Sequence, residues 1–222
     1  MGCHRGQEGI CAHQRFRPQD RELLMTIRIL MLVGLLFAAS PVFAADSASR
    51  FALRGAGLAK CEQFLKALQE RQENVLVAGS WIEGYITAVN QFTPETFDIA
   101  PWQSTQVLLG LVSRNCERNP QANVFQIVDS MRKYLQPTRL QGQSERILAE
   151  AGTSKFYLYR ETMKDVQQKL IDQGFLTGAA DGQYGPNTRS ALEAFQKAQQ
   201  IEPTGLPDQN TLLRLLTPQG GG

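Results

Sequence analysis

Histidine is almost missing from this sequence. Its two histidines, His4 and His13, both lie near the start of the 222-residue chain, and none follows them. Imidazole is a standard ligand of catalytic zinc and the side chain that most often acts as a general base. The rest of the chain therefore excludes zinc hydrolases of the usual kind and cysteine enzymes in which a histidine activates the thiol.

Long apolar runs are also scarce. One run, Ile29–Ala38, follows the basic Arg28 and precedes Val42-Phe43-Ala44, which has the small-x-small pattern of a signal-peptidase site. The run has about half of the roughly 20 residues that a membrane-spanning helix needs, so a membrane anchor is the weaker alternative. We interpret residues 25–44 as a secretory signal peptide cleaved after Ala44.

Residues 1–24 precede a second methionine, are polar and carry no targeting pattern. We interpret them as an upstream extension that does not contribute to the fold.

An excess of charge of one sign is missing as well. The whole chain has 23 basic and 21 acidic residues, and removal of residues 1–44 takes away five and three of these, which leaves 18 of each. A neutral chain gives no electrostatic attraction to nucleic acid or to an anionic membrane surface. We expect neither as a partner after signal cleavage, and no pattern in the sequence indicates a cofactor or a metal.

Cysteine is present in a small even number. Cys3 and Cys11 belong to the upstream extension, so Cys61 and Cys116 are the pair that would reach an oxidising compartment. A disulfide between them would close a loop of about 56 residues and contribute roughly 4 kcal/mol of stability. A reactive thiol is the alternative, but no histidine and no CxxC spacing is present to lower its pKa.

Helical periodicity dominates residues 55–137 and predicts a small four-helix bundle. Asn119-Pro120 should end the third helix and Pro137 the fourth. Gly79 and Gly84 flank Trp81 in the second helix, where close helix packing or a ligand surface would explain them. The predicted buried faces are Cys61, Phe64, Leu65 and Leu68; Val77, Trp81, Ile82, Tyr85 and Val89; Val107, Leu108, Leu111 and Val112; and Val124, Ile127, Val128, Met131 and Leu135.

Residues 138–161 are polar and interrupted by glycines, and we interpret them as a linker with a short helix around residues 144–151. A second unit is predicted over residues 162–217. Thr162 and Asp165 can form a capping box before a helix over residues 166–173, and Gly174 can end that helix in the left-handed conformation. With the bundle, this predicts an all-α chain.

The stretch "DGQYGPNTRSALEAFQ" predicts a tight turn followed by a helix. Gly182 and Gly185 can take positive φ, and Asp181 can accept backbone N–H bonds across the turn. Tyr184 can pack inward, and Pro186 suits the first turn of the next helix. Ala191, Leu192, Phe195 and Ala198 would form its buried face, and Leu212, Leu213 and Leu216 would close a three-helix core after a cap at Asp208.

Three segments together carry a family resemblance: "DVQQKLIDQGFLTG", "DGQYGPNTRSALEAFQKAQQI" and "TGLPDQNTLLRLL". Residues 162–216 resemble the peptidoglycan-binding domain of bacterial cell-wall enzymes. The resemblance implies a three-helix fold that attaches to peptidoglycan (murein) without cleaving it. Glu202-Pro203 departs from the small or apolar pair that is more usual in the family.

The turns must supply recognition, because the core of so small a unit is occupied by its own apolar side chains. A shallow polar groove suits a sugar or a stem peptide. The predicted ligand-binding residues are Asp181, Gly182, Tyr184, Gly185, Thr188 and Arg189, and the Arg189 guanidinium can bind a stem-peptide carboxylate. The alternative is that the turn residues only shape the turn. Thr188 and Arg189 are expected to be replaceable without disturbing it.

The bundle carries a weaker resemblance. "WIEGYITAVN", residues 81–90 between the two cysteines, is similar to small periplasmic helical proteins of the HdeA acid-chaperone type and to type VI secretion immunity proteins. Two enzymatic patterns also occur. Ser130 and Lys133 match the SxxK spacing of penicillin-binding enzymes without its companion motifs, and Glu83 is a carboxylate among apolar residues that a muramidase-like enzyme would need. A solvated helix surface explains both more simply.

The sequence thus predicts a periplasmic, cell-wall-associated protein without catalytic activity, in which the C-terminal domain binds peptidoglycan and anchors the bundle. The alternatives are an inhibitor or immunity protein directed against a wall hydrolase, an acid-stress chaperone, and an atypical murein hydrolase. A protein partner for the bundle is left open.

Overall fold

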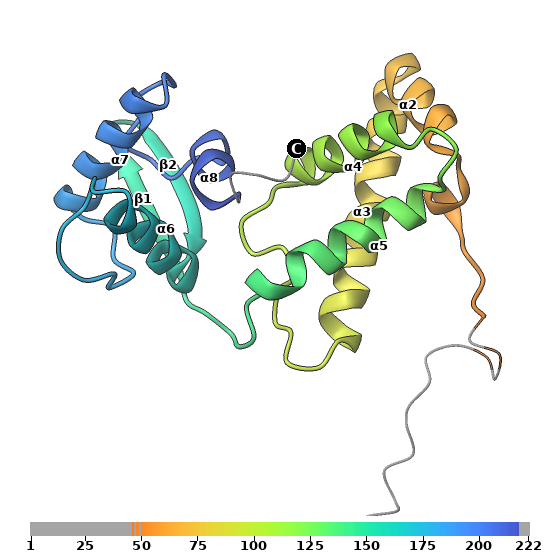
Figure 1. The fold of residues 1–222 in the computed structure, drawn as a ribbon, viewed down its shortest axis with the longest axis horizontal. Helices are drawn as coiled ribbons and strands as arrows, with labels where there is room; N and C mark the ends of the chain where they lie inside the picture. Colours follow the sequence, from red (N-terminus) through yellow and green to blue (C-terminus); the bar gives the residue numbers. More distant parts are fainter. Residues whose placement is uncertain (1–45, 47, 49, 218–222) are drawn as a thin grey trace, which may run out of the picture. The chain divides into compact units, whose positions relative to one another are not determined.

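The computed structural model describes residues 46, 48 and 50–217. The predicted upstream extension and signal peptide lie outside the described residues. The described helices and strands all belong to one compact unit, Leu53–Gly222 (Figure 1). Among the described helices none is both long and apolar enough to cross a membrane.

The helical bundle, residues 55–137, has the four helices that its periodicity predicts: α2 (Cys61–Glu70), α3 (Gln72–Phe92), α4 (Thr105–Arg118) and α5 (Val124–Leu135). Two 3-10 turns, η1 (Gly55–Leu58) and η2 (Gln136–Thr138), flank them. Asn119 caps the C-terminus of α4, as expected. Most predicted inward positions are buried or partly buried, but Val77 is 64% exposed.

Close helix packing explains one of the two glycines in α3. A Cβ at Gly79 would lie 2.8 Å from Thr105 Cγ2, so a side chain there would force α3 and α4 apart. A Cβ at Gly84 would meet nothing within 4 Å. Trp81 packs instead against η1, and its indole N–H donates to the Arg54 carbonyl at 2.8 Å.

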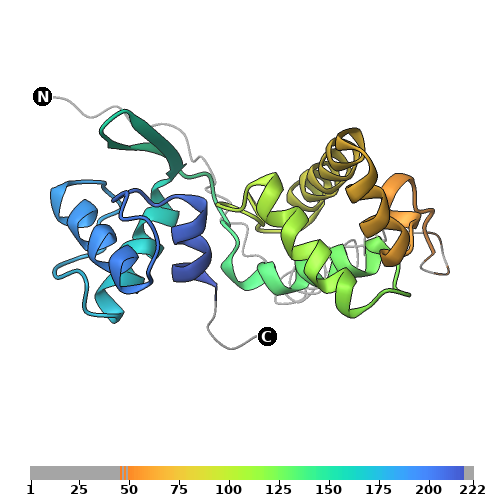
Figure 2. The same cartoon turned by 90° about the horizontal axis from the view of Figure 1, so that it is seen from above.

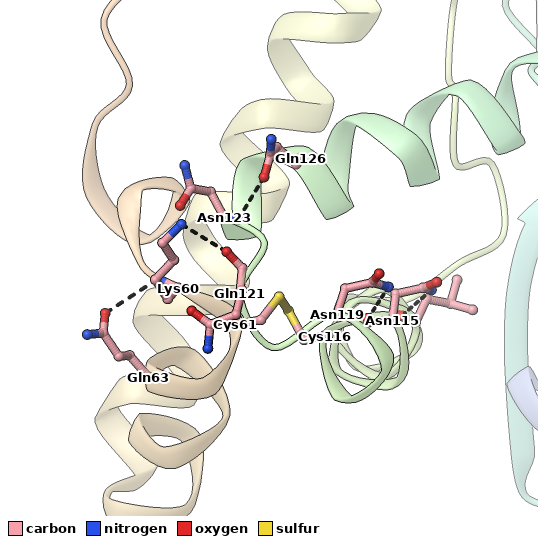
Figure 3. Close-up of a disulfide and its surroundings, with 10 residues drawn as sticks. Lys60, Cys61, Gln63, Asn115, Cys116, Asn119, Gln121, Asn123 and Gln126 are labelled. Carbon is pink, nitrogen blue, oxygen red and sulfur yellow. Dashed lines mark hydrogen bonds between the residues drawn. A yellow bond between two sulfur atoms is a disulfide. The ribbon is translucent and has the colours of Figure 1, made fainter.

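The predicted disulfide between Cys61 and Cys116 is confirmed. It joins the first residue of α2 to the last turn of α4, with the two Cα atoms 4.9 Å apart and both side chains fully buried. Figure 3 shows the Lys60 ammonium donating beside it to the Gln121 carbonyl, at 2.8 Å. The cysteine pair therefore lies where the start of α2 meets the chain between α4 and α5.

A β-hairpin occupies residues 146–159, where the sequence predicted a short helix. Strand β1 (Arg146–Ala151) pairs antiparallel with β2 (Ser154–Tyr159), and Gly152 takes a φ of +59° between them. Ala149 and Leu158 point inward and are buried. The prediction of a helix here was wrong because alternate residues of both strands face one core, which outweighs the helix preference of Ala and Glu. The described chain is mostly helical with one two-stranded sheet, rather than all-α.

Three helices follow the hairpin: α6 (Arg160–Asp172), α7 (Pro186–Ala198) and α8 (Gln209–Leu216). Figure 2 shows the hairpin and these helices together, and β2 packs on α6. We call residues 146–216 the C-terminal module. Its core contains Ala149, Leu158, Met163, Val166, Leu170, Leu176, Ala191, Leu192, Phe195, Leu206, Leu212 and Leu215.

Some details of the module differ from the sequence-based expectations. Helix α6 begins at Arg160 after an N-cap at Tyr159, so Thr162 lies inside the helix and forms no capping box. Ala198 is exposed, and Leu215 is buried deeper than Leu213. The left-handed stop at Gly174, with a φ of +77°, and the cap at Asp208 are confirmed.

Candidate functional site

The turn between α6 and α7 is organised around one buried glutamine, Gln167 of α6. Its side-chain oxygen accepts a hydrogen bond from the Gly182 amide at 2.7 Å. Its side-chain nitrogen lies within 3.1 Å of the Asp181 carboxylate, the Gln183 carbonyl and the Thr188 hydroxyl. Since unpaired polar groups are costly to bury, these bonds fix the turn to α6.

The turn between α7 and α8 repeats this arrangement around Gln196 of α7. The side-chain oxygen accepts from the Gly205 amide at 2.8 Å, and the side-chain nitrogen lies within 3.0 Å of the Thr204 hydroxyl, the Leu206 carbonyl and the Thr211 hydroxyl. Gly182 and Gly205 have φ of +72° and +68°, which favours glycine at both positions. The two turns therefore share the same hydrogen-bond arrangement around a buried glutamine.

Tyr184 joins the two turns. Its hydroxyl donates to the Gly205 carbonyl at 2.8 Å, and burial raises the pKa of this phenol. Arg189 pairs with Glu193 at 3.0 Å on the adjacent surface of α7, and both side chains lie against Gly205. Tyr184, Arg189 and Glu193 therefore gather around the buried Gly205, and we call these four residues the turn surface.

The structure places the predicted ligand-binding residues in different environments. Asp181 is exposed, and hydrogen bonds from the Gln183 amide and from Gln167 hold its pKa below the usual value. Arg189 is exposed and can reach a ligand. Thr188 is only 4% exposed and bonds to Gln167, so it cannot be changed without disturbing the turn, contrary to expectation.

The two glycines of the first turn also differ from one another. A Cβ at Gly182 would lie 2.9 Å from the Arg160 carbonyl, and the Gly182 amide is already bonded to Gln167. Gly185 has a φ of −136° and is the N-cap of α7, so the expectation of positive φ there was wrong. An extended conformation suffices because Pro186 starts the helix directly after it.

Sequence reasoning missed Gln167, Gln196, Glu193 and Gly205 as parts of this site. A signal for the repeated plan was present, since Gly182 precedes Thr188 and Gly205 precedes Thr211 by the same interval of six residues. The glutamines themselves gave no signal, because a helical glutamine is normally exposed.

The residues of the two enzymatic patterns lie in the bundle. The Ser130 hydroxyl donates to the Gln126 carbonyl, while the Lys133 ammonium pairs with Asp129 at 2.8 Å. Neither contact activates a nucleophile. Glu83 is partly buried and accepts a hydrogen bond from the Thr105 hydroxyl at 2.7 Å.

What the turn surface offers is binding chemistry. An exposed guanidinium, a partly buried tyrosine and a carboxylate stand on backbone that the two glutamines hold in place. Such groups suit a polar ligand that carries a carboxylate. In the described part of the chain no three His, Cys, Asp or Glu residues are grouped to hold a metal ion.

Comparison with known proteins links the C-terminal module to a protein family. No curated protein and no solved structure matches the chain significantly. The bundle therefore gains no support for its resemblance to the acid-chaperone and immunity proteins. Residues 159–215, which span α6, both glutamine-centred turns and most of α8, match the family model described as "Putative peptidoglycan binding domain".

Proposed function

We propose that this chain is a secreted, non-catalytic peptidoglycan-binding protein whose C-terminal module attaches the disulfide-bonded bundle to the cell wall. The observation that carries the proposal is the match of residues 159–215 to the peptidoglycan-binding family. Murein stem peptides carry carboxylates, and Arg189 on the turn surface provides a charged donor for one of them.

The export part of the proposal rests on two features. The pattern over residues 25–44 is that of a signal peptide, and the buried disulfide suits an oxidising compartment such as the periplasm. Mass spectrometry of the periplasmic protein should find a chain that starts at Ala45 and contains no free thiol. Retention of residues before Met25 would contradict this part.

The absence of catalysis is proposed from the composition of the exported chain. It has no histidine, and the structure gives neither Ser130 nor Glu83 a partner that would activate it as a nucleophile or a general acid. Incubation of the purified protein with murein should therefore release no soluble muropeptides. Release that disappears in Glu83→Gln would favour the hydrolase alternative.

A sedimentation assay tests binding directly. The exported protein should pellet with insoluble purified murein, and Arg189→Ala should weaken binding by about tenfold, since a charge-assisted hydrogen bond is lost. Lys197→Ala is the matched control, because it removes an exposed positive charge from the last turn of the same helix, outside the turn surface. Both variants should melt like the wild type, since surface ion pairs contribute little to stability. Failure of the wild-type protein to pellet would overturn the proposal.

A further inference from the structure

A pocket of about 370 Å³ lies apart from the turn surface, within the compact unit Leu53–Gly222. Its walls come from α3, from the loop 93–104 that follows it, from the hairpin, and from Leu108 of α4 and Gln209 of α8. We propose that this pocket binds a short glycan of N-acetylated amino sugars. The choice of an amino-sugar glycan rests on the proposed function, because such sugars form the glycan strands of murein.

The wall formed by the loop 93–104 is held from both sides. Gln209 of α8 donates to the Trp102 carbonyl at 2.6 Å and accepts from the Ser104 amide at 2.9 Å. Asn90 of α3 accepts from the Ile99 amide at 2.9 Å. These bonds shape the pocket before any ligand enters, which lowers the cost of binding.

The hairpin wall is fixed in a similar way. The ring of Tyr159 packs edge-on against Phe97, with 5.9 Å between centroids, and the Arg146 guanidinium lies 5.8 Å from the Tyr159 centroid. Asp98 and Leu140 exchange backbone hydrogen bonds of 3.2 and 2.8 Å, which ties the loop to the chain that leads into the hairpin.

Charged groups of both signs line the pocket. Glu83 and Asp98 bring carboxylate acceptors, while Arg146 brings a donor that forms no ion pair with any described carboxylate. Asn90 and Gln103 add amide groups that can both donate and accept. A sugar hydroxyl also both donates and accepts, so a mixed lining suits it better than it suits an anion or a cation.

Aromatic side chains complete the lining. Tyr157 is 56% exposed on the outward face of β2, although apolar rings of this size normally gain by burial. Trp102 lines the pocket from the opposing loop. The apolar C–H face of a sugar ring can cover such rings while its hydroxyls reach the polar groups around them.

The size and charge of the pocket limit the occupant. Its volume lies at the lower end of ligand pockets, which span about 300–1,000 Å³. Two carboxylates oppose one guanidinium there, so the lining does not favour a phosphate-rich ligand such as a nucleic acid or a lipid headgroup. A short, uncharged oligosaccharide fits both limits.

The two tryptophans of the chain provide a built-in assay. Trp102 lines the pocket, whereas the Trp81 indole is bonded to the Arg54 carbonyl and does not line it. In a proton NMR titration of the whole exported protein with chitotetraose, the Trp102 indole N–H signal should shift while that of Trp81 stays fixed. A soluble stem peptide should leave both signals in place. No shift of Trp102 at millimolar chitotetraose, or a shift caused only by the peptide, would overturn the proposal.

Substitutions separate the pocket from the turn surface. Tyr157→Ala should weaken chitotetraose binding about threefold to tenfold through loss of ring contact. Thr87 of α3 also lines the pocket, and Thr87→Arg should block it. Tyr134→Ala is the matched control, since Tyr134 is 52% exposed on α5 outside this pocket. An equal effect of Tyr157→Ala and Tyr134→Ala would contradict the assignment.

The same variants distinguish this proposal from the proposed function. Arg189→Ala should weaken sedimentation with murein but leave the chitotetraose titration unchanged. A silent Trp102 in a protein that pellets with murein would overturn the pocket alone. A responsive Trp102 in a protein that does not pellet would support the pocket and overturn the anchoring function.

Discussion

The bundle and the C-terminal module solve the same problem of stability in different ways. In the bundle, a disulfide joins helices that are far apart in the sequence, and apolar side chains fill the core. In the module, two buried glutamines hold the turns to the helices through eight hydrogen bonds, four from each glutamine, and no covalent link. The comparison shows that the buried polar groups of the module are concentrated where the chain turns, within the residues 159–215 that match the family model.

Removal of the disulfide should have the largest effect on the difference in stability between the bundle and the module. The double variant Cys61→Ala, Cys116→Ala should lower the free energy of unfolding of the bundle by about 4 kcal/mol, because a loop spanning 55 residues is no longer closed in the unfolded chain. Hydrogen exchange should report loss of amide protection in α2 to α5, with α6 to α8 as the internal control. Equal loss in both sets of helices would show that they unfold as one, against the distinction drawn here.

A second substitution tests whether the hairpin belongs to the module. Leu158→Ala should cost about 2–4 kcal/mol, because Leu158 is 3% exposed in the same core as the three helices. Leu148→Ala makes the same change on the outward face of the hairpin, where Leu148 is 36% exposed, and should cost much less. Urea unfolding of both variants measures the difference. Similar losses would mean that the hairpin does not share the module's core.

The hairpin also marks the limit of what the sequence could predict. Helical periodicity and the even cysteine pair gave the four bundle helices and the disulfide, because these depend on local spacing and on a simple count. Ala149, Glu150 and Ala151 favour a helix locally, and only packing of Ala149 and Leu158 on α6 to α8 makes them a strand. The boundaries proposed for bundle, linker and C-terminal domain stay predictions.

In the candidate site, too, the sequence predicted local features but not those that depend on the tertiary fold. Gly182 and Asp181 could be recognised as turn residues, since the chemistry of a tight turn is local. The buried roles of Gln167 and Thr188 could not, because each depends on a partner brought close by the tertiary fold. The pocket near Trp102 is harder still, since its lining runs from Glu83 to Gln209.

The contribution of the hydrogen bonds made by Gln167 can be tested directly. Gln167→Ala should lower the stability of the module by about 2–3 kcal/mol, because the Gly182 amide and the Thr188 hydroxyl lose a buried partner. Gln168→Ala on the exposed face of α6 is the matched control. Calorimetry gives both values. If Gln167→Ala melted like Gln168→Ala, the turn would be held by other contacts.

Raising the pH above 10 should lower the stability of the bundle more than that of the module. Burial, with the charge of Asp129 adding to it, raises the pKa of Tyr85 to about 12, and the Tyr85 hydroxyl donates to Asp129 at 3.1 Å. The folded state therefore keeps the phenol protonated above pH 10, where the unfolded chain loses this proton. The stabilising contribution is present below pH 10 and is lost as pH rises toward 12. Tyr85→Phe should flatten this decline in unfolding free energy, while Tyr134→Phe on the exposed face of α5 should not.

The smallest expected effect comes from a threonine inside the module. The Thr162 hydroxyl is buried in α6 without a hydrogen-bond partner among the described residues, whereas the Thr188 hydroxyl is bonded to Gln167. Thr162→Val should therefore leave stability unchanged or raise it by up to about 1 kcal/mol, since it removes an unpaired polar group at constant shape. Thr188→Val makes the same chemical change and should lower stability by about 1–2 kcal/mol through loss of a buried bond. Urea unfolding of the two variants should give opposite or clearly unequal shifts. A matching loss in both would show that the Thr162 hydroxyl has a partner, such as a bound water, and that buried polar groups of the module are satisfied beyond its turns as well.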